Sequence, residues 1–244
     1  ITINRPKVLN AFRGTTVDEL IHAFKTAWHD ADVGVCVLTG AGDRAFCAGG
    51  DLKERDGMTQ AQWQAQHELF ERAFVSIMEC PTPVIAAVNG HAYGGGLETA
   101  LCCDFIYASR EARFALSEVR LGIMPGGCGT QNLARAVGER RAKELVMTAR
   151  PFSAQDGLAW GAVNQVCEPG AALADALATA QAIADNAPLS VKQAKKSIHY
   201  GLQMDLLTGY RFEIEAYNRL VDTEDRREGV RAFNEKRKPA FTGR

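Results

Sequence analysis

Short apolar runs alternate with longer amphipathic stretches through the first two thirds of the chain. Val84–Val88 is an unbroken apolar run behind a proline, and Val33–Leu38 is nearly unbroken. Apolar runs of this length, rich in β-branched residues, are typical of strands buried on both faces of a parallel sheet. Shorter strands are expected at Ile1–Asn4, Phe105–Ala108, Arg113–Leu116 and Val163–Val166.

Apolar residues recur at helical spacing between these runs. Three helices are predicted behind hydroxyl residues that suit the N-cap position, with caps at Thr15 or Thr16, at Thr59 and at Ser153. Two further helices are predicted over about residues 130–137 and 139–148.

The alternation of strands and helices over residues 1–170 predicts an α/β core with mostly parallel strands. Residues 171–244 have a helical pattern throughout and predict a helical C-terminal region. One face of this region is strongly apolar, through Leu207, Tyr210, Ile214, Tyr217 and Val221. This apolar face is larger than is needed to pack on a small α/β core, so we expect it to contact another subunit as well.

A glycine-rich turn separates the strand at Val84–Val88 from a predicted helix. Gly94–Gly96 open that helix, and glycines at a helix start leave N–H groups uncovered at the positive end of the helix dipole. Glu98 follows Gly95 by about one helical turn, so both face the same spot. A turn that packs strand against helix and a binding site are equally good interpretations of this stretch alone.

The loop Phe46–Glu54, FCAGGDLKE, contains a second uncovered donor at Gly50. Two N–H groups from separate loops, Gly50 and Gly95, are what an oxyanion hole requires. Such a site binds a carbonyl oxygen as the oxygen gains charge. Considered alone, the loop would be interpreted as an ordinary tight turn.

Glu118 follows Glu98 past the predicted strand at Phe105–Ala108, so the chain can return to the same end of the sheet. Its immediate neighbours are apolar or uncharged, and such surroundings raise the pKa of a carboxyl group toward neutral pH. Two carboxylates beside one substrate can hold a water between them, one as base and one as acid. The alternative is a surface glutamate paired with Arg113 or Arg120, which is the commoner case for a single glutamate.

The composition restricts the class of protein. The 244 residues are 46% hydrophobic with a formal net charge of −1, which fits a globular chain and gives no electrostatic case for nucleic acid or an anionic membrane. The seven cysteines and five histidines show no metal-ligand spacing, which argues against a metal and for a reducing compartment. No apolar run is long enough to span a bilayer.

A dinucleotide-binding site is a weak alternative. Gly40–Ala45, GAGDRA, matches the fingerprint G-x-G-x-x-A after a predicted strand. That fingerprint needs a helix to begin at its glycines. The residues that follow, including Gly49 and Gly50, disfavour a helix there.

In their order along the chain, these motifs resemble the crotonase (enoyl-CoA hydratase/isomerase) family. The resemblance covers essentially the whole sequence. It is carried by NRPKVLNAF, FCAGGDLKE, PVIAAVNGHAYGGGLE, FALSEVRLGIMPGG, FSAQDGLAWGAVNQV and REGVRAFNEKRKPAF.

The resemblance implies an α/β fold, the crotonase-like spiral of ββα units, with a helical C-terminal trimerisation region in a homotrimer or a hexamer (a dimer of trimers). It implies an acyl-CoA thioester substrate, with Gly50 and Gly95 as the oxyanion donors and Glu98 and Glu118 as the two catalytic glutamates. The positions that contact CoA would be Lys7, Leu9, Ala48, Asp51 and Leu52, together with Phe233 and Lys236 where the last helix of a neighbouring subunit reaches the CoA.

The activity that it implies first is reversible syn addition of water to a 2-enoyl-CoA, with no metal or redox cofactor. Glu98 would take the proton of the water, and Glu118 would protonate C2. Other crotonase reactions are the second interpretation: double-bond isomerisation, or (de)hydration of carnitinyl- or methylglutaconyl-type thioesters. A non-catalytic CoA-binding or scaffold protein is the third, and the presence of all four site residues argues against it.

Two departures from the family pattern bear on the acyl group. Ser117 stands where many hydratases have proline, and Cys128 stands where the family usually has glycine. Neither removes a catalytic group. The expected location is the cytoplasm, or the mitochondrial matrix if a targeting segment precedes Ile1.

Overall fold

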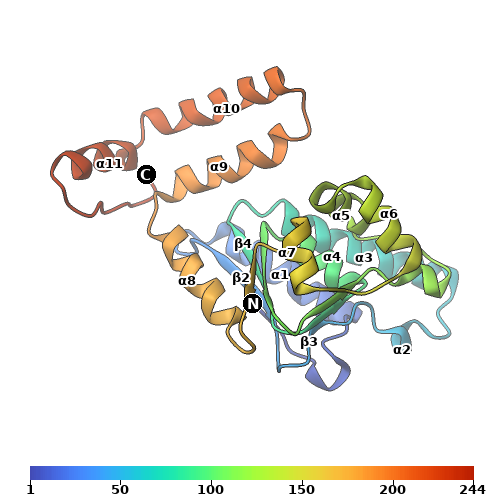
Figure 1. Cartoon of the computed structure of the whole chain (residues 1–244). Coiled ribbons are helices and arrows are strands. Elements are labelled where there is room, and N and C mark those ends of the chain that lie inside the picture. The colour runs from blue at the N-terminus through green and yellow to red at the C-terminus, as the bar shows by residue number, and fades with distance from the viewer.

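The computed structural model covers residues 1–244, and strands and helices alternate along the chain as predicted (Figure 1). The strands are β1 (Thr2–Ile3), β2 (Cys36–Gly40), β3 (Ala45–Cys47), β4 (Val84–Val88), β5 (His91–Tyr93), β6 (Phe105–Ser109), β7 (Arg113–Ala115), β8 (Phe152–Ser153) and β9 (Gln165–Cys167).

The helices of the core are α1 (Gly14–His29), α2 (Leu52–Arg55), α3 (Gln60–Met78), α4 (Gly95–Cys102), α5 (Gly129–Val137), α6 (Glu139–Thr148), α7 (Ala154–Trp160) and α8 (Ala172–Ala184). The last three helices are α9 (Pro188–Gly201), α10 (Leu206–Val221) and α11 (Glu224–Asn234). Two 3₁₀ turns are η1 (Pro6–Val8) and η2 (Glu118–Leu121).

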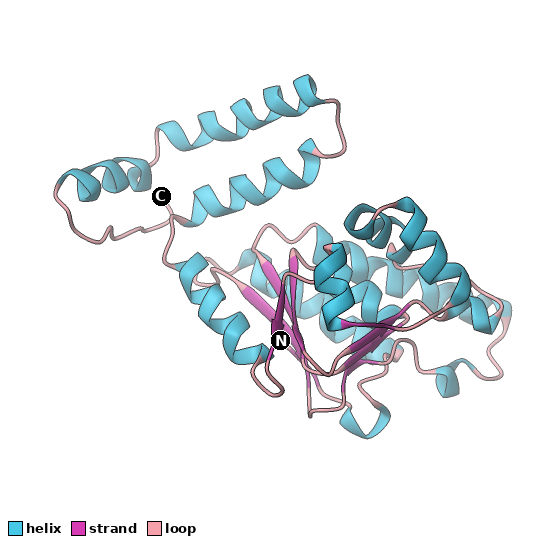
Figure 2. Ribbon diagram, viewed as in Figure 1, coloured by secondary structure: helices cyan, strands magenta, loops and turns pink.

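From β2 to β7, successive strands alternate between two sheets. The first sheet has the order β1-β2-β4-β6-β9 and is parallel throughout, and the second has the order β3-β5-β7-β8, with only β7 and β8 antiparallel. The pairs β2–β3, β4–β5 and β6–β7 each place one strand in each sheet before the chain enters a helix. The result is a spiral of ββα units, and Figure 2 shows the strands of the two sheets with helices around them.

The main core lies where the sheets and the helices α1, α3 and α4 meet, and β4 is fully buried as its apolar run predicts. A smaller apolar cluster joins β4 to α8 through Ile85, Ala87, Ala176 and Ala180. The first helix after residue 170 therefore packs on a sheet of the core. The division of the chain into residues 1–170 and 171–244 stays a prediction.

Two of the three predicted helix caps are confirmed. Thr59 forms a capping box with Gln62, and Ser153 forms one with Asp156. The cap predicted at Thr15 or Thr16 is wrong, because α1 already begins at Gly14. The Gly14 N–H donates to the Glu54 carboxylate of α2 at 3.2 Å, so a distant side chain takes the role that local sequence assigned to a threonine.

The last three helices form an arm that projects from the core (Figure 1). The ion pair between Lys195 of α9 and Asp104, at 2.7 Å, links the arm to the core. Leu202, Leu206 and Phe233 are 80%, 87% and 83% exposed on this arm. No helix has both the length and the apolar composition that crossing a membrane requires.

Candidate active site

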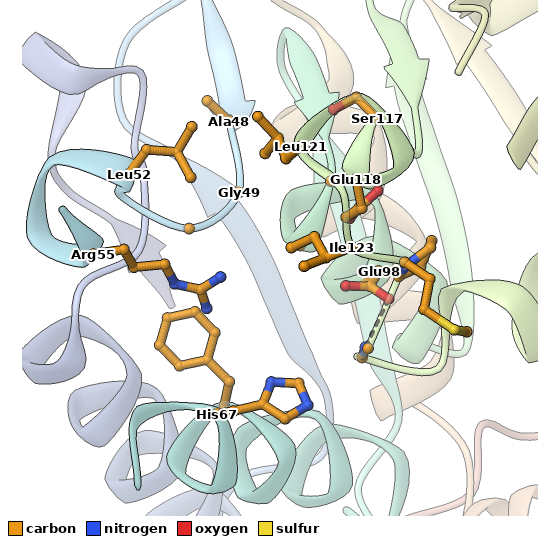
Figure 3. A pocket seen from close by; sticks show the side chains of 18 of the residues that line it. Ala48, Gly49, Leu52, Arg55, His67, Glu98, Ser117, Glu118, Leu121 and Ile123 are labelled. Atoms are coloured by element: carbon orange, nitrogen blue, oxygen red, sulfur yellow. Dashed lines mark hydrogen bonds between the residues drawn. The ribbon is translucent and has the colours of Figure 1, made fainter. Parts of the chain in front are cut away.

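One cavity of about 590 Å³ brings together the four residues predicted to do chemistry. Gly50, Gly95, Glu98 and Glu118 all line it, although they come from three segments: the loop before α2, helix α4 and η2. Figure 3 shows Glu98 and Glu118 on one side of this space and the loop of Ala48 and Gly49 on the other. The structure thus places the predicted site residues around one space.

The N–H groups of Gly50 and Gly95 are both free to bind a ligand. Phe12 exchanges hydrogen bonds with the residues on either side of Gly50: its N–H donates to the Gly49 carbonyl and its carbonyl accepts from Asp51, both at 2.7 Å. The N–H of Gly50 therefore points to the opposite side of the chain. Gly95 is the first residue of α4, so its N–H has no acceptor within the helix.

Gly49 lets these two donors approach one another. It has a φ of +91°, and a Cβ there would lie 2.9 Å from the Tyr93 carbonyl oxygen and 3.1 Å from the Gly95 nitrogen. Any side chain at this position would push the two loops apart. The close approach of the loops explains why a glycine precedes the first oxyanion donor.

Glu98 is held in place by two backbone donors. Its side chain leaves α4 in a residue that is only 4% exposed, and its Oε1 accepts from the N–H of Gly127 at 2.7 Å and of Gly129 at 3.0 Å. The pKa of Glu98 is raised, because burial raises it by more than these two hydrogen bonds lower it. Oε2 receives no hydrogen bond from the protein and is available to a water or a substrate.

Glu118 has no such partners. It begins η2, with two residues between it and the end of β7, and is 9% exposed. Neither of its carboxyl oxygens has a hydrogen-bond partner in the protein. Burial, and to a lesser degree the charge of Glu98, raise the pKa of Glu118 to about 7. The alternative of a surface glutamate paired with Arg113 or Arg120 is therefore wrong, because the chain buries this carboxyl group beside Glu98.

Two further glycines leave room for the carboxyl groups. Gly94 has a φ of +52°, and a Cβ there would lie 3.1 Å from Oε1 of Glu118. A Cβ on Gly129 would lie 2.7 Å from Oε1 of Glu98. Cys128, between the two donors to Glu98, has a φ of +66°, which is a conformation that favours glycine. The glycine-rich turns therefore position the acids as well as the oxyanion donors.

The residues predicted to contact CoA are not all at the cavity. Ala48 and Leu52 line it, and Leu9 lies behind it, where its carbonyl accepts from the Ala48 N–H at 3.0 Å. Lys7 is exposed in η1 and does not line the cavity.

Asp51 instead has structural partners. Its carboxylate accepts two bonds from Arg5, both 3.1 Å, and caps α2 through the Lys53 N–H. Phe233 and Lys236 lie on the exposed arm rather than among the residues that line this cavity. Their predicted contact with a neighbouring subunit's CoA stays a prediction.

Sequence reasoning missed part of the cavity wall. Phe70 and Phe74 of α3 line it, and neither is among the predicted site residues. Arg55 and His67 also line it. Arg55 directly follows the FCAGGDLKE motif. Its nearness to Gly50 in the sequence was the only indication that its side chain could reach the cavity.

The whole chain, residues 1–244, matches the family described as enoyl-CoA hydratase/isomerase. The short-chain-enoyl-CoA hydratase of Clostridium acetobutylicum is 42% identical over 98% of this chain and 91% of its own length. The mitochondrial enoyl-CoA hydratase of Pongo abelii is 41% identical over 99% of this chain and 82% of its own. The crystal structure of enoyl-CoA hydratase from Bacillus anthracis has a TM-score of 0.98 and 41% identity, and the match covers 100% of this chain and 94% of that one.

Proposed function

The chain belongs to the enoyl-CoA hydratase/isomerase family and has the crotonase fold, and we propose that it is an enoyl-CoA hydratase. As a hydro-lyase, it would add water reversibly across the double bond of a 2-enoyl-CoA thioester. One observation carries this proposal: two buried carboxyl groups, Glu98 and Glu118, line the same cavity as the free N–H groups of Gly50 and Gly95.

The N–H groups of Gly50 and Gly95 bind the thioester oxygen in this account. Attack of water on C3 moves charge onto that oxygen, because an enolate forms. Donors that are already oriented stabilise this charge more than the charge of the ground state. Each such donor contributes about 3 kcal/mol to the lowering of the barrier.

The two glutamates divide the proton transfers. Glu98, anchored through Oε1, holds the water with Oε2 and takes its proton as the oxygen bonds to C3. Glu118, whose pKa is raised to about 7, delivers a proton to C2 from its protonated form, so the double bond is lost as C3–O and C2–H bonds form. Proton exchange between the two acids restores the starting state. No step requires a metal or a redox cofactor.

Hydration is favoured over the other reactions of the family by the second carboxyl group. An isomerase could use the same oxyanion donors, but Glu118 beside Glu98 gives the site a place for a water between them. The assay is the loss of the conjugated thioester absorbance of crotonyl-CoA with formation of 3-hydroxybutyryl-CoA. A shifted double bond without hydration would favour isomerisation instead.

We also propose a symmetric assembly and a cellular location for the protein. The apolar arm of α9–α11 is suited to a homotrimer, or to a hexamer made from two trimers, in which Phe233 and Lys236 reach the CoA of a neighbouring subunit. The compartment would be the cytoplasm, or the mitochondrial matrix if a targeting segment precedes Ile1.

A further inference from the structure

Arg55 lies beside one of the two oxyanion donors. It ends the short helix α2, and a Cβ on Gly50 would lie 3.4 Å from Cζ of Arg55 and 3.6 Å from its Nη2. Figure 3 shows the guanidinium group pointing into the cavity, across from Ile123 and Glu98. An acyl group that begins at Gly50 and passes the two glutamates shares this cavity with the guanidinium group.

The guanidinium group is held in this orientation by neutral neighbours. Its Nε donates to Oε1 of Gln66 at 2.8 Å. Its Cζ lies 4.6 Å from the ring centre of Trp63 and 5.1 Å from that of Phe70. Contacts of this kind fix the plane of an arginine without neutralising its charge.

No carboxylate of the protein pairs with Arg55. The group makes no salt bridge, and its Nη1 and Nη2 make no hydrogen bond within the protein, although both are strong donors. Burial lowers the pKa of Arg55, with only a small opposing effect from Glu54. A half-buried cation without a partner is costly, so an anion supplied by the ligand would complete the site.

None of the other titratable side chains of the cavity is a free cation that could bind an anionic group of the ligand. Glu98 is bound to backbone donors, and Glu118 is a carboxyl group whose raised pKa of about 7 disfavours its ionised form. His67 also lines the cavity, but its Nε2 already lies 3.3 Å from a carboxylate oxygen of Glu71. Arg55 is thus the cation available to an anionic group on the acyl chain.

We propose that Arg55 determines the specificity of the reaction, and that the substrate is a 2-enoyl-CoA whose acyl group carries a second carboxylate beyond C3. The proposal rests on the hydratase function proposed above. The free edge of a guanidinium group matches a carboxylate in two parallel hydrogen bonds. Water still adds its hydroxyl to C3 and its proton to C2, and the second carboxylate takes no part in the bond changes.

Two thioesters of similar shape test the proposal. Glutaconyl-CoA carries a carboxylate on C4, and 5-methylhex-2-enoyl-CoA carries an isopropyl group in its place. The ratio of their kcat/KM values measures the preference for charge, because the CoA part and the reacting bond are the same. A site built to bind a polar group rejects the analogue that lacks it, so we expect the intact protein to prefer glutaconyl-CoA by at least ~10-fold.

Three variants assign the preference to Arg55. Arg55→Met removes the charge at similar length and should lower the ratio on the order of 100-fold, the effect of one charge-assisted bidentate pair. Arg55→Lys should retain part of the preference, because it keeps the charge but not the planar fork. Lys53→Met is the matched control, since Lys53 is an exposed cation of the same helix that does not line the cavity, and it should leave the ratio unchanged.

Equal kcat/KM values for the two thioesters in the intact protein would overturn the proposal. So would an Arg55→Met variant that slows both thioesters to the same extent, because Arg55 would then bind a part common to all acyl-CoA substrates. If Arg55→Met does not fold, Arg55→Lys and the preference of the intact protein decide the question. Hydration of crotonyl-CoA separates the two proposals. If the protein hydrates crotonyl-CoA but does not prefer glutaconyl-CoA, only the role of Arg55 is contradicted. If it hydrates none of the thioesters, the hydratase function itself is contradicted.

Discussion

Glu98 and Glu118 line the same cavity from different elements, yet only Glu98 accepts hydrogen bonds from the protein. The two N–H groups on Glu98 stabilise its ionised form, whereas the isolated Glu118 keeps its proton to about pH 7. Two carboxyl groups in unequal environments take unequal roles. This difference supports Glu98 as the base of hydration and Glu118 as the acid.

The pH dependence of kcat/KM should follow the single proton shared by this pair. We expect kcat/KM to fall as the pH rises above about 7, because the pair then loses its proton from Glu118. Hydration and dehydration start from states with the same number of protons, so both directions should show this decline. Initial rates with crotonyl-CoA and with 3-hydroxybutyryl-CoA measure it. Rates that still increase well into the alkaline range would contradict the assignment.

Glu118→Gln should make the fold more stable at alkaline pH. The folded-state pKa of Glu118 is raised to about 7 from an ordinary value of 4.5, so ionisation disfavours the folded state and stability decreases as the pH rises between these values. Glutamine removes this cost, and we expect a gain of about 1–3 kcal/mol in the free energy of unfolding at pH 8 and little gain at pH 4. Urea denaturation at both pH values measures the difference. An equal change at the two pH values would show that Glu118 is not buried in this way.

Removal of one oxyanion donor should slow catalysis without unfolding the protein. Gly95 is the first residue of α4, where proline is tolerated because that N–H has no helical partner. Gly95→Pro deletes the donor, and we expect kcat to fall on the order of 100- to 1,000-fold. Gly95→Ala is the control, because its Cβ would have no neighbour nearer than 3.7 Å and the N–H remains. Equal losses in the two variants would indicate steric disruption instead of a lost donor.

The exposed arm should mediate assembly. Light scattering of the purified protein should give the mass of a trimer or a hexamer, because isolated apolar side chains such as Phe233 would otherwise remain in water. Lys236→Ala should raise KM for crotonyl-CoA and leave kcat nearly unchanged, since this lysine would meet the CoA and not the reacting bond. A monomer in solution would contradict the proposed role of both residues.

Much of the site could be predicted because its parts are local in sequence. Gly94–Glu98 and the loop Phe46–Glu54 each combine a strand end with glycines, and such patterns indicate exposed N–H groups without knowledge of the fold. The alternation of strands and helices likewise predicted the parallel core. Only the resemblance to a family predicted that these motifs form one site, because each glycine turn considered alone could also be a packing turn.

The features that could not be predicted from the sequence depend on contacts between residues far apart in the chain. The start of α1 is set by Glu54, forty residues away from Gly14, and no local signal indicates that bond. The partners of Glu98 are Gly127 and Gly129, and no pattern in the sequence links these glycines to Glu98. The position of Arg55 in the cavity follows from its contacts with Gln66 and Trp63 on a different helix, and these contacts exist only in the folded chain.

The most direct test of the account is the rate of crotonyl-CoA hydration by the intact protein and by Glu118→Gln, followed by the loss of thioester absorbance. Glutamine keeps the shape of the side chain but cannot supply the proton to C2. We expect the intact protein to hydrate crotonyl-CoA and the variant to be at least ~100-fold slower, the contribution of one acid–base group. A variant as fast as the intact protein would contradict the role of Glu118, and an intact protein that hydrates no enoyl-CoA would contradict the function itself.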